Sequence, residues 1–469
     1  MELDRLACDR ARRARDARFD GRFFIAVTST GIYCRPICPA RAPKDENIKY
    51  FPTAAAAEAA GFRPCLRCRP EASPGTPAWH GTSGVVSRAL RLIGEGALDA
   101  EGVERLADRL GVTGRHLRRL FRQHLGATPL EVALTRRVHF AKKLLDETSL
   151  GLNEVAFASG FGSLRRFNGQ IRRTFGRTPT ELRRLARGRV ASDPECYRFR
   201  LAYRPPYDWD AMVGFLGSRA IPGVESVEES RYRRTIAVDG MSGVIEVSRL
   251  PAGSSLGLSV RFPDPRALLL IVERVRRLFD LGADPAVLAE QLGDDPLLRG
   301  PLAEHPGIRV PGAWDGFELS VAAVLGARIA GRVASMFGSP VAGGLGLETL
   351  FPTARQLLRA PLERAGVGTA RAEEIRALAR RVVDGEAALA GVDEWTAEYI
   401  AMRALGDPDA FPSGDPVLRR NAERWRPWRA YAFMLLWQDA RGDVAKSWRI
   451  GNAQSGSGRS ACNSALGAS

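Results

Sequence analysis

The chain has 469 residues and a formal net charge of +16, and its pI is near 10.1. A chain of this length exceeds one ordinary hydrophobic core, so it predicts several domains. No run approaches the ~20 apolar residues of a membrane span, and the N-terminus lacks an apolar signal segment, so we expect a cytoplasmic protein without membrane contact.

The positive charge comes almost entirely from arginine, because lysine occurs only at positions 44, 49, 142, 143 and 446. Arginine favours bidentate contacts with phosphate, so this charge indicates a polyanionic partner, most simply nucleic acid. The alternative is an arginine-rich proteome, whose proteins carry such charge without using it.

Changes in composition and periodicity divide the chain into segments of different character. Apolar residues at three and four spacing predict helices, β-branched and aromatic runs predict strands, and stretches rich in Pro, Gly, Ser and Thr predict linkers. The predicted segments are a mixed strand and helix region at 1–72, a linker at 73–84, a helical region at 85–187, a strand-rich region at 196–308, a helical region at 309–441 and a disordered tail at 442–469.

Four of the seven cysteines form two close pairs, Cys34-x3-Cys38 and Cys65-x2-Cys68. Two such pairs separated by a loop allow four thiolates to surround one zinc ion, and so small a domain would need the metal to fold. Disulfides are not expected in a reducing compartment. From the spacing alone, a closed structural zinc site is favoured. The remaining cysteines are interpreted as buried or incidental thiols: Cys8, Cys196 and Cys462.

The sequence around this cluster, "FDGRFFIAVTSTGIYCRPICPARAPKDENIKYFPTAAAAEAAGFRPCLRCRPE", closely resembles the N-terminal domain of the Ada family of bacterial adaptive-response DNA methyltransferases. The resemblance implies that Cys34 is both a zinc ligand and a nucleophile, and that it takes a methyl group irreversibly from a DNA methylphosphotriester. It implies that Cys38, Cys65 and Cys68 hold the zinc only. The chemistry is consistent, because zinc keeps a thiol deprotonated and a thiolate is a soft nucleophile suited to a methyl carbon.

Methyl transfer would also allow this domain to sense damage. Methylating one thiolate removes one negative charge from the site, so its repulsion from the DNA backbone falls and DNA binding tightens. Four polar or basic residues beside the cysteines match the family motif, and we expect them to contact phosphate: Thr30, Arg41, Arg63 and Arg67. The alternative is that they are solvent-exposed residues without a role in binding.

Two helix-turn-helix patterns follow in tandem, "VERLADRLGVTGRHLRRLFRQHLGATPLEV" and "LNEVAFASGFGSLRRFNGQIRRTFGRTPTEL", with turns at Gly111 and Gly160. The "GF" turn, the later "FG.TP.E" pattern and the duplication resemble the all-α DNA-binding domain of the AraC family. The alternative is a helical bundle with solvated arginines. The resemblance implies DNA contact by arginines of the second helix of each pair: Arg115, Arg118, Arg119, Arg165 and Arg166.

The rest of the chain resembles the AlkA-type 3-methyladenine DNA glycosylases in "YRPPYDWDAMVGFLGSRAIPGVESVEESRYRRTIAV", "PGIRVPGAWDGFELSVAAVLG" and "AERWRPWRAYAFMLLW". The resemblance implies a β-rich α+β subdomain and an all-α helix-hairpin-helix domain that flips a base out and hydrolyses its N-glycosidic bond. Asp415 matches the catalytic aspartate, which stabilises an oxocarbenium-like transition state. The alternative for Asp415 is a turn aspartate before Pro416. Lysine is absent between residues 144 and 445, so no amine there can form a Schiff base and monofunctional hydrolysis is expected.

Three aromatic residues match the base pocket of the glycosylase family: Trp395, Tyr399 and Trp437. An alkylated purine is cationic and electron-poor, so aromatic faces bind it by stacking and cation–π attraction. Ordinary core packing is the alternative for each of these residues.

The glycosylase-like half departs from the family pattern in three places. The hairpin reads "AGVDEWTA", so Ala390 replaces a proline and Asp393 replaces a glycine, while Gly391 remains as the expected phosphate contact. Segments around the hairpin and after Asp415 are shorter than in the family. "LGARIAG" replaces a glutamine-containing turn and an apolar wedge, which leaves Arg328 near the wedge position as an expected DNA contact.

The predicted fold class is multidomain α+β. It combines a small zinc-bound α/β domain, an AraC-type all-α helix-turn-helix domain, a small β-rich α+β subdomain and a helix-hairpin-helix all-α glycosylase domain.

The predicted function is repair of and response to DNA alkylation, with one Zn²⁺ as cofactor and double-stranded DNA and RNA polymerase as partners. The alternative is a methylation-activated transcription regulator whose glycosylase-like domain is catalytically impaired.

Overall fold

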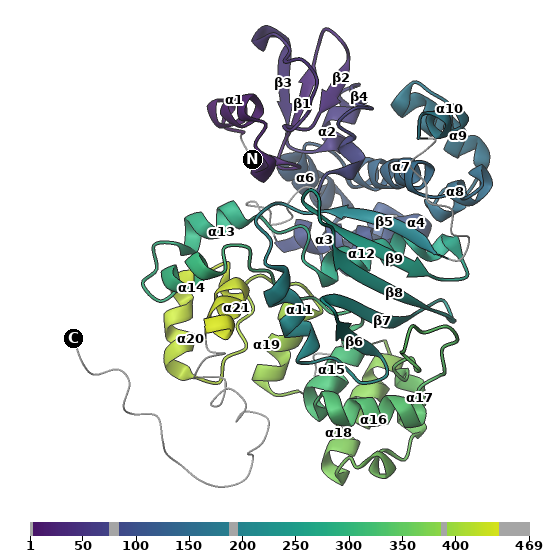
Figure 1. The fold of residues 1–469 in the computed structure, drawn as a ribbon, viewed down its shortest axis with the longest axis vertical. Coiled ribbons are helices and arrows are strands. Elements are labelled where there is room, and N and C mark those ends of the chain that lie inside the picture. The colour runs from purple at the N-terminus through teal and green to yellow at the C-terminus, as the bar shows by residue number, and fades with distance from the viewer. Residues whose placement is uncertain (1–2, 75–83, 187–195, 386–391, 440–469) are drawn as a thin grey trace.

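The computed structural model describes residues 3–74, 84–186, 196–385 and 392–439, and Figure 1 shows how these segments are arranged. Four predicted features lie outside the described residues: most of the linker, Cys462, the hairpin residues Ala390 and Gly391, and the tail at 442–469. Within the described part, no helix is long and apolar enough to cross a membrane.

The N-terminal region folds around a four-stranded sheet with the strand order β3-β1-β2-β4. The apolar side chains of the first strand are all buried. The second and fourth strands run parallel and pair Tyr33 with Pro64, so Cys34 and Cys65 follow at the same edge of the sheet. The elements of this region are α1 (Arg5–Ala14), β1 (Phe24–Val27), β2 (Ile32–Cys34), β3 (Ile48–Phe51), α2 (Ala54–Ala59) and β4 (Arg63–Pro64).

Eight helices follow in the described residues between 84 and 186, as the periodicity predicts. They are α3 (Gly84–Gly94), α4 (Ala97–Ala100), α5 (Val103–Arg109), α6 (Gly114–Leu125), α7 (Pro129–Glu147), α8 (Leu152–Ala158), α9 (Leu164–Phe175) and α10 (Pro179–Ala186). The pairs α5–α6 and α8–α9 turn at Gly111 and Gly160, whose positive φ values of 70° and 79° favour glycine. The long helix α7 joins the two pairs and starts with a capping box between Thr128 and Glu131.

A five-stranded antiparallel sheet forms the middle of the molecule, with the strand order β5-β9-β8-β7-β6. In the first of these strands, Phe199 and Leu201 are buried and alternate with exposed Arg198 and Arg200, so one face packs on the core. The elements here are β5 (Tyr197–Ala202), α11 (Trp209–Gly217), β6 (Glu225–Glu228), β7 (Arg231–Val238), β8 (Met241–Arg249), β9 (Ser255–Arg261) and α12 (Leu268–Leu278).

The remaining helices form two groups, one at the bottom and one at the left of Figure 1. The first group consists of α15 (Gly316–Leu325), α16 (Ala327–Phe337), α17 (Ala354–Arg359) and α18 (Thr369–Val383). The second consists of α13 (Pro285–Leu292), α14 (Arg299–Glu304), α19 (Glu394–Arg403), α20 (Pro416–Ala422) and α21 (Arg429–Asp439). In the second group, Trp425 Nε1 donates to Asp295 Oδ2 at 2.8 Å, which joins segments far apart in the sequence.

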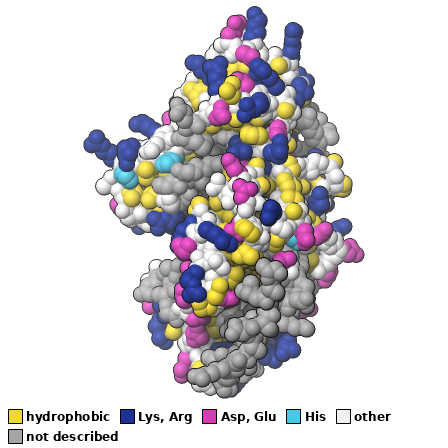
Figure 2. Space-filling model, turned by 90° about the vertical axis from the view of Figure 1, so that its left-hand side faces the viewer, with side chains coloured by type: hydrophobic (Ala, Val, Ile, Leu, Met, Phe, Trp, Pro, Cys, Tyr) yellow, Lys and Arg dark blue, Asp and Glu magenta, His cyan; other side chains and the backbone are white. Residues whose placement is uncertain are grey.

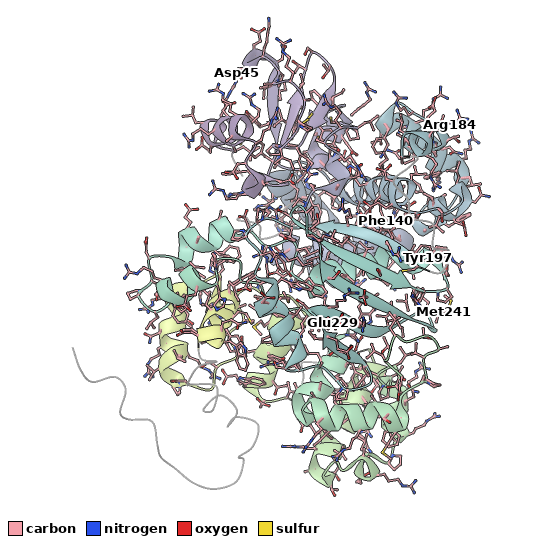
Figure 3. The ribbon with its side chains drawn as sticks, viewed as in Figure 1. Asp45, Phe140, Arg184, Tyr197, Glu229 and Met241 are labelled. Atoms are coloured by element: carbon pink, nitrogen blue, oxygen red, sulfur yellow. The ribbon has the colours of Figure 1, made fainter. Side chains whose placement is uncertain are left out.

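Helix α7 also packs against the central sheet. Figure 3 labels Phe140 of α7 where the helix meets the sheet, and its ring centroid lies 6.2 Å from that of Phe199. Lys143 Nζ donates to the carbonyl oxygen of Arg200 at 2.6 Å, and Glu147 accepts a bond from the Arg200 N–H at 3.2 Å. One helix therefore contacts both the regions before it and the sheet after it.

A buried carboxyl connects the end of α12 to the C-terminal helix α21. Asp280 Oδ2 accepts hydrogen bonds from the Tyr431 hydroxyl at 2.9 Å and from the Val310 N–H at 3.2 Å. Burial raises the pKa of Asp280 to about 6. Because this pKa is higher in the folded than in the unfolded chain, the contribution of Asp280 to stability is complete below the unfolded value and is lost as the pH rises through about 6.

Replacing this carboxyl by an amide should therefore stabilise the protein at neutral pH. Asp280→Asn keeps an oxygen acceptor for both donors and tolerates the positive φ of 47° at this position. At about pH 7.5 we expect the free energy of unfolding to rise by up to about 3 kcal/mol, and the melting temperature to rise with it. At about pH 4 we expect almost no change. Differential scanning calorimetry at both pH values measures this, and an equal effect at both would show that ionisation of Asp280 does not matter.

Candidate zinc centre and base pocket

The four clustered cysteines converge on one point. The sulfur atoms of Cys34, Cys38, Cys65 and Cys68 all lie within 4.8 Å of one another. Tetrahedral zinc with ~2.3 Å zinc–sulfur bonds requires sulfur–sulfur distances of roughly 3.8 Å, which a small contraction of this cluster reaches. Four thiolate donors are the set that structural zinc prefers, so the residues fit this metal.

The four sulfurs differ in their access to solvent. Cys65 and Cys68 are each 7% exposed, whereas Cys34 and Cys38 are only half-buried. The Arg35 N–H donates to the Cys68 sulfur at 3.3 Å, and the Arg35 side chain is held by Asp20, to which Nε donates at 2.8 Å. The side of the cluster formed by Cys34 and Cys38 is therefore more exposed than the side formed by Cys65 and Cys68.

Contacts among the thiols pull their pKa values apart. The pKa of Cys38 falls to about 7, mainly because the Cys34 thiol donates to it, and the pKa of Cys65 is lowered mainly for the same reason. The pKa of Cys34 is raised mainly by Cys38, and that of Cys68 mainly by Cys34. Four sulfurs at this distance therefore share protons, and only a cation among them allows all four to ionise.

A buried polar cluster connects the zinc region to helix α7. The hydroxyl of Tyr33, the residue before Cys34, donates to Glu58 Oε1 at 2.8 Å. From α7, the His139 Nε2 atom lies 2.9 Å from Glu58 Oε1, and the Thr135 hydroxyl donates to Glu58 Oε2 at 2.8 Å. Burial alone would lower the pKa of His139, but Glu58 raises it, so the two form an ion pair.

A second cluster makes a similar connection from the other side of the zinc site. Arg69, the residue after Cys68, pairs with Asp146 of α7 at 2.7 Å and with Glu71 at 3.2 Å. Lys142 of α7 also pairs with both Glu71 and Asp146. Since residues adjacent to two zinc ligands are anchored on α7, the zinc site has a defined position relative to both helix-turn-helix pairs.

The predicted phosphate-contact residues lie on the surface of the zinc region. Thr30, Arg41 and Arg67 are exposed, and Figure 2 shows Lys and Arg side chains gathered on the upper part of the molecule, where this region lies. Arg63 is also exposed, but its guanidinium packs at the C-terminal end of α9: a Cβ on Gly176 would meet Arg63 Nη1 at 2.7 Å. The positive charge of Arg63 therefore complements a helix C-terminus in addition to facing solvent.

The predicted DNA-contact arginines occupy α6 and α9 of the two helix-turn-helix pairs. Arg115, Arg165 and Arg166 are exposed near the N-terminal ends of these helices. Arg118 instead pairs with Glu104 of α5 at 2.6 Å, and Arg119 lies 3.2 Å from the His116 ring nitrogen. The arginines on α6 are thus partly engaged within the pair, whereas those on α9 project outward.

Asp415 caps the N-terminus of α20. Its Oδ1 atom accepts hydrogen bonds from the backbone N–H groups of Val417 at 2.7 Å and Leu418 at 3.3 Å. The side chain is exposed, and Oδ2 makes no hydrogen bond with any other described residue. One carboxylate oxygen of Asp415 therefore has the structural role expected of a turn aspartate before Pro416. The second oxygen faces solvent.

The three predicted pocket aromatics come from α19 and α21. Trp395 and Tyr399 stack with centroids 5.0 Å apart and an angle of 12° between the rings. Trp437 is half-buried, and its indole N–H is buried without a hydrogen-bond partner among the described residues. Burial would raise the pKa of Tyr399, but Arg403 and then Arg219 lower it below its usual value.

Arg219 contacts two of the predicted pocket aromatics, and the sequence did not identify it. It follows α11, far from the aromatic residues in sequence, yet its guanidinium lies 4.3 Å from the Trp437 ring centroid. Arginine is so frequent in this chain that no local pattern distinguishes this one. The other predicted contacts of this half are separate: Arg328 is exposed at the start of α16, and Gly391 lies outside the described residues.

Three family models match successive parts of the chain. The metal binding domain of Ada matches residues 7–71, a helix-turn-helix domain matches residues 106–185, and the AlkA N-terminal domain matches residues 198–315. The predicted resemblances are thereby confirmed, in the predicted order.

A relative from Mycobacterium tuberculosis, a probable bifunctional transcriptional activator/DNA repair enzyme AlkA, is 41% identical over 93% of this chain and 97% of its own length. The chain belongs to this AlkA family. Two other relatives resemble parts of it. DNA-3-methyladenine glycosylase 2 of Escherichia coli is 31% identical over 51% of this chain and 96% of its own length. The bifunctional transcriptional activator/DNA repair enzyme AdaA of Bacillus subtilis is 34% identical over 37% of this chain and 79% of its own length.

The protein should retain zinc as purified, and the cysteine cluster gives a direct test. We expect one zinc ion per chain, and Cys65→Ser should abolish its retention because a buried thiolate donor is replaced by a poor one. Cys8→Ser is the matched control, since Cys8 is 4% exposed and lies in a separate apolar cluster. Metal analysis by plasma mass spectrometry measures both; zinc retained by Cys65→Ser, or lost from Cys8→Ser, would contradict the assigned ligands.

Proposed function

We propose that this chain responds to DNA alkylation in two ways: it accepts methyl groups on Cys34 to become a transcriptional activator, and it removes alkylated bases as a glycosylase. The main support for the first activity is a four-thiol cluster in which Cys34 and Cys38 are half-buried and Cys65 and Cys68 are buried. The support for the second is family membership together with Asp415, whose carboxylate is exposed.

Methyl transfer to Cys34 is a simple displacement. The Cys34 thiolate attacks the methyl carbon of a methylphosphotriester, a carbon–sulfur bond forms, and the carbon–oxygen bond breaks to leave a phosphodiester anion. One zinc ion held by Cys34, Cys38, Cys65 and Cys68 would keep the Cys34 sulfur deprotonated at neutral pH. The product thioether has no route back, so each chain accepts one methyl group and the reaction is stoichiometric.

The loss of one negative charge at Cys34 then strengthens the binding of DNA. Thr30, Arg41 and Arg67 are exposed neutral or positive residues close to the cysteines in sequence, and Arg63 adds a positive charge beside the end of α9. With less repulsion from the cluster, these residues bind backbone phosphates more tightly. This electrostatic attraction weakens as the salt concentration rises.

The helix-turn-helix pairs supply the regulatory output. α6 and α9 carry exposed Arg115, Arg165 and Arg166 near the ends that enter a major groove in such motifs. Arg118 and Arg119 contribute phosphate contacts once released from Glu104 and His116. RNA polymerase is the protein partner that an activator of this class recruits.

Base removal relies on Asp415. Its carboxylate projects from the N-terminus of α20, and a carboxylate beside the sugar stabilises the positive charge of an oxocarbenium-like transition state. The described core of this half contains no lysine, so hydrolysis proceeds without a Schiff base and the enzyme is monofunctional. Trp395, Tyr399 and Trp437 provide the aromatic surface for the extruded base.

A second candidate, a regulator with an impaired glycosylase domain, is favoured by Asp393. This residue caps α19, where its carboxylate accepts from the Thr396 N–H at 3.0 Å and from the Thr396 hydroxyl at 2.6 Å. A phosphate approaching this helix N-terminus would meet a negative charge and occupied donors, which weakens the backbone contact that a helix-hairpin-helix makes.

Base release from alkylated duplex DNA separates these candidates. Wild-type protein should release 3-methyladenine, and Asp415→Asn should release it at least ~100-fold more slowly, because the amide still caps α20 but carries no charge. Asp407→Asn is the matched control, since Asp407 makes a similar local contact to the N–H of Asp409. If the folded wild type releases no base, the glycosylase candidate is contradicted and the regulator with an impaired glycosylase domain is supported. Unchanged release by Asp415→Asn would show that Asp415 takes no part in the mechanism.

A further inference from the structure

The predicted base pocket already contains a cation. The Arg219 guanidinium carbon lies 4.3 Å from the ring centroid of Trp437 and 4.1 Å from that of Phe215, which is the last aromatic residue of α11. Both distances are within the ~6 Å range of cation–π attraction. A flat, delocalised guanidinium stacks on aromatic rings much as a planar base does.

The same arginine reaches the other side of the predicted pocket. Arg219 lowers the pKa of Tyr399, both through its charge and through a hydrogen bond. Tyr399 in turn stacks on Trp395. Two of the aromatic residues matched to a base pocket, Trp437 and Tyr399, thus interact with Arg219, and Trp395 joins them through Tyr399. Arg219 itself comes from the strand-rich part of the chain.

The Trp437 indole provides an independent sign that this position accommodates a ligand. Its Nε1 atom is buried and has no acceptor among the described residues. A buried N–H without a partner costs free energy, and an acceptor atom that enters beside the ring, in the plane of the indole, would satisfy it. Arginine has only donors, so Arg219 covers the ring without meeting this need.

We infer that Arg219 occupies the place of the alkylated base in the free protein and must leave the Trp437 ring before a base can stack there. This inference deepens the proposed function, since it concerns the base pocket of the same glycosylase half. Arg219 therefore sets the affinity of the pocket for cationic bases in two ways. It competes for the ring face, and after displacement its charge remains close enough to repel a cationic base.

Two nucleosides of almost the same shape separate these effects. 7-Methylguanosine carries a positive charge on its ring system, whereas guanosine is neutral. In the Arg219→Met variant, whose apolar side chain still covers Phe215, the dissociation constant of 7-methylguanosine should fall roughly 2- to 30-fold, the range set by one cation–π contact. Guanosine should gain less, because it was never repelled by the arginine charge.

Isothermal titration of the full-length protein with each nucleoside measures both changes. Arg219→Lys keeps the charge but not the flat face, so its affinity for 7-methylguanosine should lie between those of the wild type and Arg219→Met. Arg299→Met, at an exposed position on α14, is the control and should bind as the wild type does. Melting temperatures of the variants confirm that each one is folded.

An Arg219→Met variant that binds 7-methylguanosine no more tightly than the wild type would overturn the inference, as would equal gains for both nucleosides or no binding by either protein. Because the readout is binding, it is separate from base release. Tighter binding by Arg219→Met in a protein that releases no bases would support the role of Arg219 and contradict only the glycosylase activity.

Discussion

Buried charge on helix α7 is the constraint on which the arrangement of the molecule depends. Lys142, Lys143 and Asp146 are each less than 9% exposed, and buried charges are tolerated only when they are paired. Their partners come from different regions: Arg69 lies beside a zinc ligand, and the Arg200 carbonyl belongs to the central sheet. Moving either region away would leave these buried charges only their partners within the helix, Asp146 for Lys142 and Glu147 for Lys143, so α7 favours the arrangement in which the outside partners are also present.

This arrangement places the two chemical sites in contrasting surroundings. The zinc cluster lies at a sheet edge, with two sulfurs accessible and the neighbouring Tyr33 and Arg69 anchored on α7. The predicted base-pocket residues lie among helices drawn from both ends of the glycosylase-like half, and Arg219 covers the ring of Trp437. Under the proposed function, the first site reacts near the surface, whereas the second must rearrange before it can enclose a base.

The features that depend on local pattern were predictable. Cysteine spacing indicated the cluster, helical periodicity indicated α5, α6, α8 and α9, and composition indicated that residues 1–72 mix strands and helices. Features that depend on contacts between distant segments were not. Glu58 and His139 are 81 residues apart, and nothing near either one identifies its partner. Arg219 was missed for the same reason, and the capping roles of Asp393 and Asp415 required the helix starts to be located.

The central claim is that Cys34, and no other sulfur of the cluster, accepts the methyl group. Mass spectrometric mapping of the zinc-loaded protein after incubation with methylphosphotriester DNA tests it most directly. The account predicts a single methyl group on Cys34 and none on Cys38, although both sulfurs are accessible. Methyl found on Cys38, Cys65 or Cys68, or on none of the four cysteines, would contradict it.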